Sequence, residues 1–84
     1  KITQEIIEQN KYKYLTKLHV SDNKNIKNLN HLKFLKVLNC SYICGINQNG
    51  ISKLNLIELN AANNLNIKNI NHMRNTLKIL NCRT

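Results

Sequence analysis

Apolar residues recur along this chain at a fixed spacing, with polar residues between them. The fullest copy of the pattern has seven positions: Leu56, Leu59, Ala61, Asn64, Ile67, Ile70 and Met73. An equivalent series begins at Leu15, 41 residues earlier, and shorter copies begin at Leu35 and Leu77. The central leucine of the four copies falls at residues 18, 38, 59 and 80. A period of 20 or 21 residues is typical of repeats that stack into a solenoid.

Within each copy, two inward positions are separated by two residues, which is the period of a β-strand. We therefore predict short parallel strands at residues 17–20, 37–40, 58–61 and 79–82, in one sheet and in chain order. After the Asn position the apolar residues come every third residue, which favours a tight 3₁₀-like or irregular return path. One unit offers too few apolar side chains to offset the entropy of ordering it, so the units must stack.

The spacing divides the chain into units of one small domain, residues 1–84. We expect residues 1–14 to be the end of a preceding unit or a terminal cap of the array. This segment should contain a short amphipathic helix that follows Thr3, its expected N-cap residue. Residues 15–34, 35–55 and 56–76 are the repeats, and residues 77–84 begin a fourth. Solenoids normally carry terminal caps, whereas the fourth unit here supplies only its strand. We therefore expect flanking repeats of the same chain beside these.

The second repeat departs from the pattern, because Ile43 stands where the other repeats have Asn23 and Asn64. Either the row of Asn side chains is interrupted there, or the turn slips by one residue and Cys44 takes the place. Gly45 and Gly50 both lie in this repeat and permit positive φ, so we expect its return path to be the most irregular.

The three cysteines do not indicate a disulfide framework. Cys40 and Cys82 occupy the same inward position two units apart, which places their Cα atoms roughly 9–10 Å from each other. A disulfide needs less than about 7 Å. We therefore expect both to be small core residues in a reducing compartment.

The pattern L-x-x-L-x-small-x-x-N resembles the leucine-rich repeat over residues 15–82. The segments LKVLNCS, GINQNGI, LNLIELNAANN and IKNINHM are similar to the Asn-rich repeats of F-box/leucine-rich-repeat proteins of large amoeba-infecting DNA viruses. The resemblance implies an α/β solenoid with short parallel strands on the concave face and short helical or irregular convex segments. It also implies the substrate-recognition part of an F-box type ubiquitin ligase adaptor, in the cytoplasm, and in the host cytoplasm if the chain is viral.

The strand positions that point away from the core predict a site for a protein partner on the concave face. Its expected residues are Lys17, His19, Val37, Asn39, Glu58, Asn60, Ile79 and Asn81. A second set forms a basic column at one edge, just before the strands, and consists of Lys13, Lys33, Lys53 and Arg74. This column and the net charge of +9 support the alternative function, the binding of an anion or nucleic acid. We favour a protein partner, because the strand face lacks the interleaved aromatic residues on which single-stranded nucleic acids stack.

Catalytic chemistry is not indicated. The chain has four acidic residues and no glycine-rich phosphate loop, and the repeat geometry produces no Ser-His-Asp or Cys-His arrangement. His31 and His72 lie two units apart, too far for one zinc ion. We therefore expect a non-enzymatic protein with no cofactor and no metal site, and no association with a membrane, since no apolar run reaches 18 residues.

Overall fold

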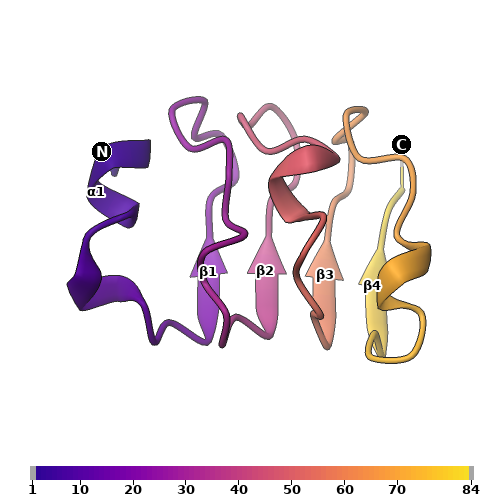
Figure 1. Ribbon diagram of the computed structural model, residues 1–84. Coiled ribbons are helices and arrows are strands. Elements are labelled where there is room, and N and C mark those ends of the chain that lie inside the picture. The colour runs from indigo at the N-terminus through magenta and orange to yellow at the C-terminus, as the bar shows by residue number, and fades with distance from the viewer. Residues whose placement is uncertain (1, 84) are drawn as a thin grey trace.

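The computed structural model describes residues 2–83 as a row of short strands joined by longer return segments (Figure 1). The elements in chain order are α1 (Gln4–Ile7), η1 (Asn10–Tyr12), β1 (Lys17–His19), β2 (Val37–Asn39), η2 (Asn49–Ile51), β3 (Glu58–Asn60), η3 (Asn71–Met73) and β4 (Ile79–Asn81), where η denotes a 3₁₀-helix. The helix α1 lies at the β1 end of the row, and its N-cap residue Thr3 accepts a hydrogen bond from the backbone N–H of Ile6 at 3.3 Å.

The four strands form one parallel sheet in the order β1-β2-β3-β4. The central leucines are in register, with Leu18 beside Leu38, Leu38 beside Leu59, and Leu59 beside Leu80. The predicted strands, their direction and their order are thereby confirmed, and each strand ends one residue earlier than predicted. Short helical segments precede β1 and lie between β2 and β3 and between β3 and β4, which is compatible with an α/β repeat fold, whereas the segment between β1 and β2 has no helix.

A turn that repeats after each strand explains the early ends. The Oδ1 atom of the last strand residue accepts the backbone N–H two residues on in three copies: Asn39 from Ser41, Asn60 from Ala62 and Asn81 from Arg83. This local hydrogen bond competes with continuation of the strand. In the first three copies, the third residue after the strand has φ near +60°; these residues are Asp22, Tyr42 and Asn63. That conformation suits Asn and Asp better than a bulky residue such as Tyr42.

The core lies between the sheet and the return segments and follows the predicted periodicity. The central strand leucines Leu38 and Leu59 are each 1% exposed, whereas Leu80 in β4 is 43% exposed. Cys40 is buried as expected, but Cys82 is exposed, so the prediction of a buried Cys82 is wrong. The physical reason is that each inward strand position is covered by the return segment of its own coil, and none covers β4 within residues 2–83.

The return segment of the second repeat runs very close to that of the first. A Cβ atom added at Gly45 would lie 2.5 Å from the carbonyl oxygen of Ile26, and one at Gly50 would overlap the carbonyl oxygen of Lys27. Neither glycine has a positive φ, so the expected use of their conformational freedom is wrong. Their small size is needed instead, because two backbones meet there. The backbone N–H of Leu29 donates to Gly50 O at 2.9 Å across this contact.

Glutamine side chains tie the return segments together at two equivalent places. Gln4 Oε1 accepts the backbone N–H groups of Lys27 and Asn28 at 2.7 and 3.0 Å, and its Nε2 donates to Asn28 O at 2.8 Å. Gln48 makes the same three contacts with Lys68 and Asn69. Backbone groups that the irregular path leaves unpaired thus gain partners.

The rings of His31 and His72 form a second pair of equivalent contacts between return segments. Their Nε2 atoms lie 3.1 Å from Ile7 O and 3.2 Å from Ile51 O. Each ring therefore joins its own coil to the preceding one.

Asn64 is a buried polar side chain of the turn after β3, with 5% of its surface exposed. Its Nδ2 donates to Cys40 O at 2.9 Å and to Ile46 O at 3.2 Å in the neighbouring coil, and its Oδ1 accepts the backbone N–H of Asn66 at 3.1 Å. Asn23 is half-buried and donates to Ile2 O at 2.9 Å. In the second repeat Ile43 is 67% exposed and Cys44 only 8% exposed. The turn therefore slips by one residue, and Cys44 takes the Asn position.

Candidate functional site

Two rows of side chains cross the outer face of the sheet, the face that points away from the core. Because the strands are parallel and in register, equivalent residues lie side by side. One row alternates charge and apolar surface and contains Lys17, Val37, Glu58 and Ile79. The second row is polar and contains His19, Asn39, Asn60 and Asn81. All eight predicted residues are exposed or half-buried, and Ile79 has 58% of its surface free.

An open hollow of about 420 Å³ lies on this face over β1, β2 and β3. It is lined by six residues, Lys17, Leu18, His19, Val37, Asn39 and Glu58. The structure thus brings five of the eight predicted residues together, while Asn60, Ile79 and Asn81 continue the surface beyond the hollow. Lys17 and Glu58 stand on either side of Val37, two strand spacings or roughly 10 Å from each other. The hollow therefore offers a positive group, an apolar side chain and a negative group, side by side on three adjacent strands.

The amides of the Asn row are only partly available to a partner. Their Oδ1 atoms already accept the backbone N–H groups of the turns that follow the strands. Within residues 2–83, no hydrogen bond uses the Nδ2 groups of Asn39, Asn60 or Asn81. The row consequently presents NH₂ donors at strand spacing, and it suits a partner that brings oxygen acceptors.

A hydrogen-bonded chain of side chains extends the polar row at its β1 end. Ser21 Oγ lies 2.6 Å from His19 Nε2 and donates to Asn39 Oδ1 at 3.1 Å, and the buried Ser41 hydroxyl donates to the same Oδ1 at 2.8 Å. Since the Ser21 proton is directed at Asn39, the His19 ring is assigned as the donor to Ser21. The network holds the His19 ring in place on the outer face. The sequence analysis did not select Ser21 and Ser41 as site residues, because their pairing depends on how adjacent turns stack.

The four residues of the basic column are all exposed, but they do not share one position in the turns. Lys13 and Arg74 are the C-cap residues of η1 and η3, whereas Ser52 caps η2 and Lys53 is the next residue. Lys13 also lies over the ring of Tyr14, 5.1 Å from its centroid. Lys53 therefore lies one residue beyond the C-cap position that Lys13 and Arg74 occupy.

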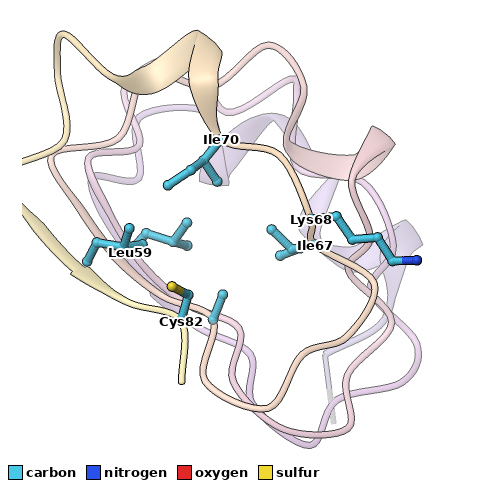
Figure 2. A pocket seen from close by; sticks show the side chains of 7 residues that line it. Leu59, Ile67, Lys68, Ile70 and Cys82 are labelled. Carbon is cyan, nitrogen blue, oxygen red and sulfur yellow. The ribbon is translucent and has the colours of Figure 1, made fainter. Parts of the chain in front are cut away.

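A second hollow, of about 250 Å³, lies at the β4 end of the core and is lined mainly by apolar side chains. Figure 2 shows the chain encircling it, with Leu59, Ile67 and Ile70 directed toward the enclosed space and Lys68 reaching away. Apart from Lys68, its lining residues occupy inward positions of the third and fourth units, so the hollow is the uncovered end of the core.

No group of three or more His, Cys, Asp or Glu residues within residues 2–83 is arranged to hold a metal ion. None of the helices in that range has the length and apolar character required to cross a bilayer.

Comparisons of this chain with protein-family models, with curated proteins and with solved structures found no match.

Proposed function

We propose that this chain is a leucine-rich-repeat solenoid that binds a protein partner on the outer face of its sheet, which is the concave face of such a solenoid. The observation that carries the proposal is the hollow over β1 to β3 with its two aligned rows. Aligned side chains on a hydrogen-bonded sheet need little ordering when a partner docks, which lowers the entropic cost of association.

The chemistry of the rows describes the complementary partner surface. An acidic group would face Lys17, an apolar side chain would cover Val37, and a basic group would face Glu58. Carbonyl or carboxylate oxygens would accept from the free Nδ2 groups of the Asn row. The role as a substrate receptor of a ubiquitin ligase, and the cytoplasmic location, follow from the sequence resemblance alone and stay predictions.

The test uses peptides selected from a displayed random library on the parent chain, measured for affinity against two double variants. Lys17→Glu with Glu58→Lys reverses the order of charges on the outer face and leaves the net charge of +9 unchanged. We expect most selected peptides to lose about tenfold or more in Kd, because like charges then face each other. Lys33→Ala with Lys53→Ala is the matched pair on the basic side and should mainly slow association at low salt.

Asn60→Asp is a finer probe of the polar row. The carboxylate can still accept the Ala62 N–H, so the turn keeps its hydrogen bond, whereas the NH₂ donor is replaced by an acceptor. Weaker binding at nearly unchanged thermal stability is expected. If the charge reversal leaves binding intact and the Lys33/Lys53 pair abolishes it, anion binding by the basic side is the better account.

A further inference from the structure

Two aromatic side chains are open to solvent at the edge of the sheet where return segments lead into the strands. Tyr14 lies three residues before β1 and Phe34 three residues before β2, at the end of the strands from which the arrows in Figure 1 start. Tyr14 is 65% and Phe34 51% exposed. Their ring centroids are 5.4 Å apart, with the ring planes at 40°. These two rings, the aromatic pair, therefore contact each other and still present open surface to a ligand.

Lysines flank the aromatic pair. Lys13 and Lys33 of the basic column each directly precede one of the rings, and Lys36 follows Phe34 by two residues; all three lysines are exposed. The Nζ atom of Lys13 lies 5.1 Å from the centroid of the Tyr14 ring. An ammonium group over a ring face is attracted by the negative charge of that face. Positive charge and stacking surface thus occur on one patch of the molecule.

The acidic residues of the chain leave this patch positively charged. Asp22 lies in the turn at the opposite end of β1, Glu5 lies in α1, and Glu8 is the C-cap residue of that helix. Glu58 begins β3 on the outer face and belongs to the next coil after Phe34. With a net charge of +9 on the whole chain, the patch attracts anions and raises their local concentration.

We propose that the aromatic pair and the lysines beside it bind single-stranded nucleic acid. Bases stack on the open surface of Tyr14 and Phe34, and ammonium groups such as that of Lys13 neutralise the phosphates on either side. When a base takes the face of the Tyr14 ring, Lys13 is released to a phosphate. A double helix hides the faces of its bases, so exposed rings favour a single strand.

This patch is separate from the outer-face hollow, because neither ring of the aromatic pair lines that hollow. The stacking rings that the outer face lacks are found at its edge. Binding of nucleic acid there is consequently independent of the protein partner proposed above, and each proposal can fail without the other.

The experiment titrates the chain into fluorescently labelled single-stranded DNA and RNA of the same short sequence and follows anisotropy. We expect both strands to bind, because they share bases and phosphates. Tyr14→Ala with Phe34→Ala should raise Kd about tenfold or more, since the stacking surface is lost. Tyr42 is 56% exposed in the turn after β2, so Tyr42→Ala is the matched control and should leave Kd unchanged.

The lysines are tested by salt dependence. Lys13→Ala with Lys33→Ala should raise Kd and make the plot of log K against log salt shallower by about 1.4, at about 0.7 for each phosphate contact of a single strand. Lys24 and Lys27 are exposed in the return segment after β1. Replacing both by alanine removes the same charge from another surface and should change the slope less.

An abasic strand of the same length gives the sharpest comparison, because it carries the phosphates without the bases. It should bind the parent chain about tenfold or more weakly than the intact strand. Equal affinity would overturn the proposal, and this result does not depend on the folding of any variant. Unchanged affinity of the Tyr14/Phe34 variant, equal effects of the two lysine pairs, or a preference for a duplex of the same sequence would also overturn it.

Discussion

Replacing Leu59 by alanine is expected to lower the free energy of unfolding by about 2–5 kcal/mol. Leu59 is 1% exposed and lies between Leu38 and Leu80 in the central row of the sheet. Truncation removes buried apolar surface and leaves a cavity that neighbours on both adjacent strands must fill. Chemical denaturation of the variant and the parent measures the loss directly.

Leu80→Ala is the matched control, because it removes the same atoms from the same register position in β4. Leu80 is 43% exposed, so its truncation should cost clearly less than that of Leu59. Equal losses for the two variants would mean that β4 is covered in solution or that Leu59 is not.

Replacing Asn64 by alanine is expected to cost about 1–3 kcal/mol. The variant leaves the carbonyl groups of Cys40 and Ile46 and the N–H of Asn66 without their present partner. Because these groups are in two coils, the loss weakens both a turn and the contact between units. Thermal and chemical denaturation should show it as a lower midpoint.

Two further variants separate these roles. Asn64→Asp can still accept the Asn66 N–H, but it no longer donates to the second coil and sets a buried carboxylate against the carbonyl oxygens of Cys40 and Ile46. Because the turn keeps its hydrogen bond while the contact between coils becomes repulsive, we expect this variant to be at least as destabilising as Asn64→Ala. Asn66 is exposed, and Asn66→Ala should change stability little. An Asn64→Ala variant as stable as Asn66→Ala would contradict the structural role of Asn64.

The apolar spacing alone was enough to predict the strands, their order and most of the core. Side chains along a strand alternate between its two faces, so once the units stack Leu38 must point inward and its neighbours in the strand must point outward. The outer-face residues follow from the same constraint, which is why Lys17, Val37 and Glu58 could be predicted as neighbours.

Hydrogen bonds between return segments could not be predicted in the same way. The contacts of Gln4 and Gln48 depend on which backbone groups an irregular path leaves unpaired, and no periodicity encodes that. The Asn row shows a similar limit, since Oδ1 of Asn39 turned out to be used by its own turn. The Asn that recurs as the last residue of β2, β3 and β4 was the available signal. Cys82 was wrongly predicted to be buried, because the pattern indicates that its side chain points inward but not whether another segment packs over it.

The central claim is that consecutive coils stack in parallel register and so build one outer face. Nuclear Overhauser contacts between strands in an isotopically labelled sample test it most directly. The account predicts that backbone protons around Leu38 contact those around both Leu18 and Leu59, in the pattern of parallel strands. Close Hα–Hα contacts typical of an antiparallel pair, or no contact between the segments of Leu38 and Leu59, would contradict it.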